Sequence, residues 1–504
     1  MAGGLLHHGL EQAARRFGDR SAMAYGNDTW SFDALERAAG TFAGQLAARG
    51  VVAGSRVVVM TTNRPEFVAA VLGISKLGAA AVLLNPAWKA LEVNHALSLT
   101  SPVLAVADGP AVAVLGDQMG ESRVTDLDDG LLSTGAAPAA PSVPSASVDE
   151  DVLLVFSSGT TGLPKAVRHT HGSIGAAIGH WKDALGLSSE DRFQVATPPS
   201  HILGLLNLVT AISAGAWVRL HRRFDLDEVL SRIESDRMTL EMAVAPIALA
   251  MANHPDLEKY DLSSLRYIMW GATPVTPSVA ETVTRRTGVR WLPAYGASEL
   301  PVIAANPVGR PDAWRLDSAG LPPIGVELRV ADLDHGGSLP PGAVGEIQAR
   351  SPSLMAGYLP GEATAGAFAD GWYRTGDVGW LEPGGWVHLT DRSKEMIKVK
   401  GFQVAPAELE AVLLGHPGVV DCAVFGMSDE QSGEVPVAAV QLQAGSPATA
   451  DELDRLVAES LASYKRLHKV VVVDAIPRLP SGKVLRRVLR DEWEPRLRAD
   501  RADA

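Results

Sequence analysis

The most informative part of this sequence is Val155-Phe-Ser-Ser-Gly-Thr-Thr-Gly-Leu-Pro-Lys165, where a polar loop directly follows a short apolar run. Glycines allow successive backbone N–H groups to turn toward one anion. Hydroxyls donate hydrogen bonds to phosphate oxygens, and Lys165 adds a compact positive charge. Pro164 stands where a Walker A loop has its second glycine, so the loop predicts a polyphosphate site of a different design. A loop of this composition is equally typical of a plain turn, and the rest of the chain has to decide.

The composition is that of a globular enzyme with more than one core. The chain has 504 residues, of which 46% are hydrophobic and 20% charged. Lysine and arginine number 45 against 58 acidic residues, which gives a net charge of −13. Nucleic acids and anionic membranes both require a basic surface, so we expect neither to be a general partner.

The sequence carries no sign of secretion or of membrane insertion. Cys422 is the single cysteine, so no intramolecular disulfide can form and a reducing, cytoplasmic setting is expected. Residues 1–20 lack the basic-then-apolar pattern of a signal peptide. The longest apolar stretch, residues 68–84, is interrupted by Lys76 and by glycines, so no membrane span is predicted. Monomer and homodimer both remain open.

Helices and strands are predicted to alternate over the first part of the chain, which is typical of parallel sheets covered by helices. Leu35, Ala38, Phe42 and Leu46 recur at helical spacing, and Gly50 follows as a stop. The elements expected here are a helix over 32–49, a strand over 56–60, a helix over 65–77, a strand over 80–84, a helix over 90–99 and a strand over 103–107.

Composition changes divide the remainder into further parts. Residues 136–148, rich in Pro, Ala and Ser, predict a surface linker. Strands are expected near 266–269 and 290–292, and the Gly/Pro-rich residues 319–349 predict a β-barrel-like subdomain. The last hundred residues predict a separate α+β domain, with strands over 396–400, 419–425, 435–443 and 470–473 and helices over 406–414 and 451–461. The fold class expected is therefore α/β, with helix-covered sheets, a barrel-like subdomain and a small C-terminal domain.

Four further motifs follow the polar loop in order. They are Tyr295-Gly-Ala-Ser-Glu299, Tyr373-Arg-Thr-Gly-Asp377, a charged and β-rich run from Asp391 to Gln403, and Leu479-Pro-Ser-Gly-Lys483. An aromatic ring can stack on a base, and a carboxylate can ligate Mg²⁺ or accept ribose hydroxyls. Taken singly, each segment is equally well explained as a turn acid or a solvated lysine.

Taken together, the five motifs resemble those of the adenylate-forming superfamily, which contains acyl-CoA synthetases, luciferases and peptide-synthetase adenylation domains. The resemblance covers essentially the whole chain. The segment Lys400-Gly-Phe-Gln-Val-Ala-Pro-Ala-Glu-Leu-Glu410 is most similar to the 4-coumarate:CoA ligase branch, which also includes amide bond synthetases. The resemblance to the superfamily implies a domain over residues 1–392 that binds ATP and acid, and a mobile domain over 393–504 that turns about a hinge near Lys394.

The resemblance also implies the roles of individual residues. Tyr295 would lie against adenine beside Gly271, Ala272 and Gly296, Ser298 would bind the α-phosphate, and Asp377 and Arg392 would hold the ribose. Glu299, with the hydroxyl of Thr161, would ligate Mg²⁺. Lys483 would bridge the acid and the α-phosphate, and Lys398, Gly401 and Gln403 would serve the later acyl transfer to coenzyme A. The β- and γ-phosphates would be held by Ser157, Ser158, Gly159, Thr160, Thr161, Gly162 and Lys165.

The acid pocket is expected near His201, Trp270 and Ala294. His201, in Pro-Pro-Ser-His-Ile-Leu-Gly204, matches the histidine that closes the acyl pocket in the resembled family. Trp270 and Ala294 depart from the usual family pattern while the phosphate motifs keep it. We expect an altered acid pocket, suited to a compact or aromatic acid, beside an ordinary ATP site. His169 and His171 are expected to be structural.

The function implied is ATP-dependent activation of a carboxylic acid as acyl-AMP, followed by transfer to coenzyme A. An amine acceptor, which would make the enzyme an amide bond synthetase, is the main alternative, because both activities keep Lys483 and the hinge. A carrier-protein thiol and luciferase-like oxidation also remain open. A non-catalytic binder is disfavoured, because Lys483, Glu299 and Asp377 are all present.

Overall fold

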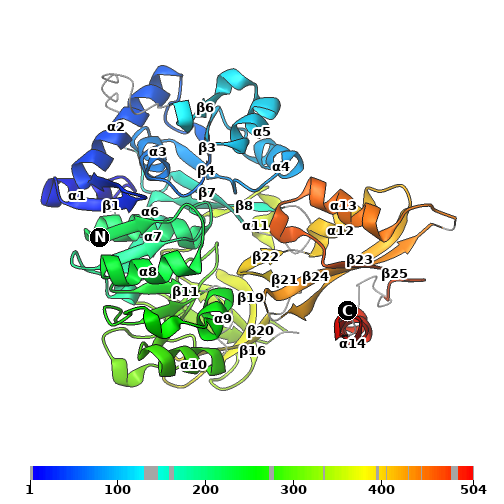
Figure 1. Ribbon diagram of the computed structural model, residues 1–504. Coiled ribbons are helices and arrows are strands. Elements are labelled where there is room, and N and C mark those ends of the chain that lie inside the picture. Colours follow the sequence, from blue (N-terminus) through cyan, green and yellow to red (C-terminus); the bar gives the residue numbers. More distant parts are fainter. Residues whose placement is uncertain are drawn as a thin grey trace. The chain divides into compact units, whose positions relative to one another are not determined.

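The computed structural model divides the chain into two compact units, which we describe separately (Figure 1). Unit 1 comprises residues 1–86, 96–156 and 166–391, and unit 2 comprises 87–95, 157–165 and 392–504. The structure describes residues 4–129, 146–157, 164–243, 245–271, 277–332, 335–392, 397–404, 406–429, 431–443, 445–477 and 486–502. The predicted linker lies mostly outside the described residues, and the hinge residue Lys394 lies wholly outside them.

A seven-stranded sheet in the order β17-β8-β7-β4-β3-β5-β6 forms the first layer. Strands β3 to β7 pair in parallel, and β17 joins β8 in antiparallel fashion at the edge. The parallel arrangement agrees with the alternation expected from the sequence. The strands are β3 (Arg56–Met60), β4 (Ala80–Leu83), β5 (Leu104–Ala107), β6 (Val124–Asp126), β7 (Asp151–Ser157), β8 (Lys165–Thr170) and β17 (Gly357–Leu359).

The helices that accompany this sheet begin and end where local chemistry requires. Helix α2 starts after Ser31, whose hydroxyl accepts the N–H of Ala34 at 3.1 Å, and its predicted apolar positions are buried. Helix α3 carries Pro65 in its first turn. A Cβ on Gly73 of α3 would lie 2.7 Å from the Ala39 carbonyl oxygen, so glycine permits close α2–α3 packing. The helices are α2 (Phe32–Ala48), α3 (Pro65–Lys76), α4 (Ala90–Thr100) and α5 (Pro110–Met119).

Two more sheets with parallel pairing complete the helix-covered part of unit 1. One has the order β2-β1-β10-β9 and the other β11-β12-β13-β14. Their strands are β1 (Ser21–Tyr25), β2 (Asp28–Ser31), β9 (Arg192–Val195), β10 (Trp217–Leu220), β11 (Glu241–Ala243), β12 (Ile268–Trp270), β13 (Trp291–Tyr295) and β14 (Ala304–Ala305). The accompanying helices are α1 (His8–Phe17), α6 (His171–Leu185), α7 (Ile202–Ala214), α8 (Leu226–Asp236), α9 (Ala245–Asn253) and α10 (Pro277–Thr287).

The segment expected to be barrel-like contributes to a five-stranded antiparallel sheet. Its order is β15-β16-β19-β18, with β20 also paired to β19. The strands are β15 (Glu327–Ala331), β16 (Gly345–Arg350), β18 (Phe368–Ala369), β19 (Trp372–Leu381) and β20 (Val387–Arg392), with the short helix α11 (Glu362–Ala365) before β18.

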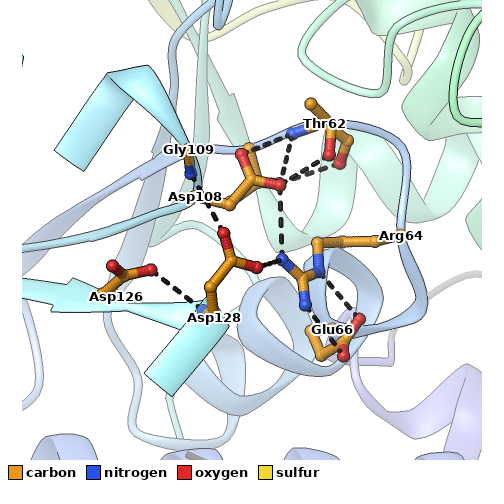
Figure 2. Close-up of polar contacts among 8 residues, drawn as sticks. Thr62, Arg64, Glu66, Asp108, Gly109, Asp126 and Asp128 are labelled. Carbon is orange, nitrogen blue, oxygen red and sulfur yellow. Dashed lines mark hydrogen bonds and ion pairs between the residues drawn. The ribbon is translucent and has the colours of Figure 1, made fainter. Parts of the chain in front are cut away.

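One arginine ties together three strand ends of the large sheet (Figure 2). Arg64 begins the turn into α3, and its guanidinium contacts Glu66 at 3.0 Å, Asp108 at 3.4 Å and Asp128 at 2.7 Å. Asp108 also accepts the backbone N–H of Thr62 at 3.0 Å. Because β3, β5 and β6 are parallel, their carboxyl ends share one edge, and the arginine offsets part of the negative charge of the acids gathered there.

Unit 2 contains a mixed sheet with two apolar faces. The order is β22-β21-β24-β23, and β25 pairs with β24 in parallel. Alternate residues of β23 point to opposite faces: Cys422 packs in the core that contains α12 and α13, and Phe425 packs in the core that contains α14. The elements are β21 (Ile397–Val399), β22 (Phe402–Val404), α12 (Pro406–Leu414), β23 (Val419–Asp429), β24 (Gly433–Leu442), α13 (Ala450–Ser460), β25 (Lys469–Val472) and α14 (Arg486–Ala502). None of the described helices is long and apolar enough to span a membrane.

Candidate active site

The predicted Tyr-Gly-Ala-Ser-Glu segment forms a tight turn at the carboxyl end of β13. A Cβ on Gly296 would lie 2.1 Å from the carbonyl oxygen of Pro301, so the turn requires glycine at this position. The N–H of Ala297 donates to the carbonyl of Leu300 at 2.9 Å and closes the turn. The turn therefore presents Ser298 and Glu299 at the strand end, where ligands bind in open α/β sheets.

His169 holds this turn from β8. Its Nε2 lies 2.8 Å from the carbonyl oxygen of Ser298, and its Nδ1 lies 3.2 Å from the hydroxyl of Ser173. Complete burial lowers the pKa of His169 to about 4, so the ring is neutral near pH 7. A carbonyl only accepts, so Nε2 carries the proton and donates it to Ser298. This contact is not predictable from the sequence, because the partners are 129 positions apart.

Glu299 is held by its backbone and by its side chain. The N–H of Met355 donates to its carbonyl oxygen at 2.8 Å, and the hydroxyl of Tyr358 donates to Oε1 at 2.8 Å. Glu299 is 9% exposed and Tyr358 is 8% exposed. Burial, followed by the charge of Glu299, raises the pKa of Tyr358 above its ordinary value, so the phenol keeps its proton. Tyr358 was not among the residues predicted from the sequence.

A second phenol–carboxylate pair joins two of the predicted motifs. The Tyr295 hydroxyl donates to Oδ2 of Asp377 at 2.6 Å, across 82 positions of sequence. Both residues are buried, and the N–H of Asp377 donates to the hydroxyl of Thr375 at 3.1 Å. Tyr373, on the same strand β19, is buried as well, and burial followed by the charge of Glu299 raises its pKa well above the ordinary value. The residues expected at adenine and at the ribose therefore meet in one place.

His201 is the N-cap residue of α7. Its Nδ1 accepts the backbone N–H of Leu203 at 3.2 Å, which leaves the ring proton on Nε2. Burial lowers its pKa to about 4, so this tautomer is neutral near pH 7. A Cβ on Gly204 would lie 2.3 Å from the Pro198 carbonyl oxygen, so glycine lets the preceding loop fold tightly against the helix.

Trp270 lies within a hydrophobic core of unit 1. It is 1% exposed, and its ring lies 5.2 Å from that of Trp291, in the core that also contains Met251 and Val283. Ala294, on the neighbouring strand β13, is partly buried against the main core of unit 1. The burial of Trp270 is that of a core residue, and its place at the acid pocket stays a prediction.

The other predicted residues lie at or near strand ends, in β22, or outside the described part of the chain. The structure places Ser157 at the end of β7, Lys165 at the start of β8 and Gly271 directly after β12, with its N–H donating to Ala243 at 3.2 Å. Arg392 ends β20 and Gln403 lies in β22, where their backbones are described. The predicted residues outside the described part of the chain are Ser158, Gly159, Thr160, Thr161, Gly162, Ala272, Lys394 and Lys483.

The residues predicted for acyl transfer form a hairpin in unit 2. Lys398 in β21 lies opposite Gln403 in β22. Lys400 and Gly401 join the strands with φ values of +50° and +84°, the left-handed geometry of a two-residue hairpin turn. The N–H of Lys398 donates to Oε2 of Glu434 at 2.8 Å, which anchors the hairpin to β24.

The chain matches two family models. The model described as AMP-binding enzyme matches residues 10–359, and the model described as AMP-binding enzyme C-terminal domain matches residues 408–483. A curated relative, 4-coumarate–CoA ligase 2 of Nicotiana tabacum, is 34% identical over 96% of this chain and 94% of its own length. A second, 4-coumarate–CoA ligase 5 of Oryza sativa subsp. japonica, is 34% identical over 94% of this chain and 91% of its own length.

Two solved structures share the whole architecture. The o-succinylbenzoate CoA synthetase MenE of Bacillus subtilis, bound to a product analogue, is 31% identical with a TM-score of 0.88, over 97% of this chain and 99% of its own. The amide bond synthetase McbA of Marinactinospora thermotolerans is 30% identical with a TM-score of 0.85, over the same shares of the two chains. The expected α/β fold class and the expected family are thereby confirmed. The chain belongs to the AMP-binding enzymes, the adenylate-forming family of ATP-dependent carboxylic acid ligases.

Proposed function

We propose that the enzyme converts a compact or aromatic carboxylic acid and ATP into acyl-AMP and pyrophosphate, and then transfers the acyl group to coenzyme A. The observation that carries this proposal is the convergence of Ser298 and Glu299 with the Tyr295–Asp377 pair, since one ATP needs groups for phosphate, metal, base and ribose together. The names of the relatives support the acid class, because 4-coumarate and o-succinylbenzoate are aromatic acids.

Different side chains bind different parts of the nucleotide. Tyr295 presents a ring to adenine, and Asp377 accepts the ribose hydroxyls with the help of Arg392. Ser298 donates to the α-phosphate from a turn whose backbone is held by His169. The loop from Ser157 to Lys165 supplies hydroxyls, amides and one cation for the outer phosphates, as its composition predicts.

The described residues fit a magnesium ion that is shared with the nucleotide. Glu299 and Asp377 are buried acids, so a polyphosphate can lie beside Glu299 only when a cation offsets the repulsion. Mg²⁺ characteristically takes one or two carboxylates and fills its other positions with phosphate and water. Glu299 would hold the ion with the Thr161 hydroxyl, and the ion would neutralise phosphate charge.

The first step joins two anions. A carboxylate oxygen of the acid forms a bond to the α-phosphorus, the bond from that phosphorus to the bridging oxygen breaks, and pyrophosphate leaves. Lys483 offsets the negative charge on both reactants. The neutral His201 offers an Nε2–H donor at the acid, because its Nδ1 is occupied by the helix cap. In the second step the thiol of coenzyme A loses its proton and its sulfur bonds to the acyl carbon, the bond from that carbon to the phosphate oxygen breaks, and AMP leaves. Lys398, Gly401 and Gln403 would serve this acceptor.

An amide bond synthetase is the second candidate, and the likeness to McbA favours it. In that reaction an amine nitrogen bonds to the acyl carbon, AMP leaves, and the nitrogen loses a proton. The adenylation half of the two activities is identical, so the acceptor alone distinguishes them.

Competition between acceptors tests the proposal. The enzyme is incubated with ATP, Mg²⁺ and a panel of aryl and alkyl acids, with coenzyme A and a simple amine both present, and products are identified by mass spectrometry. We expect a thioester of a compact or aromatic acid as the main product. Formation of amide with little thioester would show that the acceptor is an amine and not coenzyme A. An optimum at long alkyl acids would contradict the proposed acid class.

A further inference from the structure

Glu299, the proposed metal ligand, has one carboxylate oxygen already engaged. Tyr358 donates to Oε1 at 2.8 Å. Within the described part of the chain no second donor reaches this carboxylate. A carboxylate that accepts a hydrogen bond at one oxygen keeps lone pairs on the other for a hard cation. The hydrogen bond therefore selects which oxygen faces a metal.

The backbone around Tyr358 fixes where its hydroxyl can lie. Tyr358 is opposite Val167 in the β17–β8 ladder, and its N–H donates to the hydroxyl of Thr364 at 2.9 Å. The preceding Gly357 has φ +137°, and a Cβ there would lie 3.0 Å from the Thr364 hydroxyl oxygen. With the side chain 8% exposed and the backbone held on two sides, the phenol is restricted to a direction that reaches Glu299.

The direction of this hydrogen bond follows from the chemistry of the two groups. A carboxylate oxygen accepts and a phenol hydroxyl donates, so the proton of Tyr358 is directed to Oε1 of Glu299.

We propose that Tyr358 is a positioning residue, which presents one oxygen of Glu299 to the Mg²⁺ of MgATP. This inference rests on the proposed function, because that function assigns the metal to Glu299. Groups that hydrogen-bond to a metal-ligating carboxylate commonly contribute about 10- to 100-fold to metal affinity or activity. Tyr358 acts through Glu299 and contacts neither the acid nor the reacting phosphorus in this proposal.

The test is Tyr358→Phe, which removes the hydroxyl and keeps the ring. We expect the Mg²⁺ concentration that gives half-maximal acyl-AMP formation to rise about tenfold or more. At saturating Mg²⁺ we expect kcat to recover to within a few-fold of wild type. A direct readout is the electron paramagnetic resonance signal of free Mn²⁺, titrated against enzyme with a non-hydrolysable ATP analogue. Mn²⁺ binding should weaken by a similar factor.

Tyr267→Phe is the matched control. Tyr267 is fully buried in unit 1, and its hydroxyl donates to the carbonyl of Leu185, away from Glu299. Each variant removes a phenol hydroxyl that donates a buried hydrogen bond, so a fall in Tm is expected in both, and only Tyr358→Phe should change the metal dependence. Equal metal dependence in both variants and wild type would overturn the proposal. So would a further loss of Mn²⁺ affinity when Tyr358→Phe is added to Glu299→Gln, since Tyr358 is proposed to act through Glu299.

The failure of this inference is distinguishable from failure of the proposed function. If wild-type enzyme binds Mn²⁺ with the ATP analogue but forms acyl-AMP from no acid, the proposed reaction is wrong, and the Mn²⁺ titration still decides the role of Tyr358. If wild-type enzyme binds no Mn²⁺ with the analogue, both are wrong.

Discussion

At the residue scale, Lys483 carries the most specific prediction about the chemistry. We expect Lys483→Ala to lower acyl-AMP formation by about 100-fold or more, since it removes the cation that offsets two reacting anions. Transfer from supplied acyl-AMP to coenzyme A should remain within a few-fold of wild type, and the two half-reactions are assayed separately. Lys182→Ala, at an exposed lysine in the last turn of α6, is the control. Unchanged adenylation in Lys483→Ala would show that this lysine has another role.

Some site residues are predictable from sequence and others are not, for a physical reason. Short motifs whose residue types indicate their chemistry contain Tyr295, Ser298, Glu299 and Asp377. Tyr358 and His169 act through contacts made 59 and 129 positions away along the chain. A hydrogen bond formed by tertiary packing leaves no local pattern, so such supporting residues become visible only in the folded structure.

At the element scale, the turn from β3 into α3 depends on Arg64. We expect Arg64→Met to destabilise unit 1 by about 2 kcal/mol, because Asp108 would remain buried without its cation. Chemical denaturation at pH 7 measures the change. Arg15→Met removes a pair with Glu11 in which the arginine is 79% exposed, and should cost less than about 1 kcal/mol. Equal losses in the two variants would contradict the structural role of Arg64.

Two buried histidines, the N-cap residue of α1, His7, and the first residue of α6, His171, make stability depend on pH. Nδ1 of His7 lies 2.9 Å from the hydroxyl of Ser75, and Nδ1 of His171 accepts the N–H of Leu6 at 3.0 Å. Burial lowers both pKa values from 6.5 to about 4. For His7, Lys76 and His8 act in the same direction as burial, and Glu11 opposes them.

A histidine whose pKa is lower in the folded than in the unfolded state stabilises the protein above the unfolded value. That contribution is lost as pH falls from 6.5 toward 4, by about 3 kcal/mol for each group over the whole interval. We expect the double variant His7→Gln with His171→Asn to show a shallower loss of stability between pH 6.5 and 4, measured by denaturation. Parallel profiles for variant and wild type would contradict this assignment.

Elements with a strong period were predicted within a residue or two. The helix expected over 32–49 is α2, the helix over 406–414 is α12, and the strand over 56–60 is β3. Helix α7, buried on nearly every side, has no polar face, so its period could not be recognised from the sequence. Trp270 shows the same limit, because the sequence indicates a large apolar surface but not which core receives it.

At the scale of the whole molecule, the order of the five motifs identified the family, while the placement of the two units requires more than sequence. Unit 2 joins residues 392–504 to the shorter segments 87–95 and 157–165. The domain boundary expected after residue 392 and the rotation about Lys394 remain predictions. The motifs fall in both units, and the alternating use of the small domain that the family resemblance implies remains a prediction.

The hairpin of unit 2 provides a test of that alternation. Gly401 has φ +84°, which a branched side chain rarely adopts. We expect Gly401→Leu to reduce thioester formation at least tenfold, since misplacing groups that position a reactant commonly costs that much, and to leave acyl-AMP formation nearly unchanged. Loss of both half-reactions together with a lower Tm would indicate misfolding of unit 2, and intact thioester formation would contradict the role of the hairpin.

The central claim, that this site forms acyl-AMP, is tested most directly by exchange of labelled pyrophosphate into ATP. The account predicts exchange only when an accepted acid is present, and its loss in Glu299→Gln. Exchange without acid, or formation of ADP and phosphate in place of AMP and pyrophosphate, would contradict it.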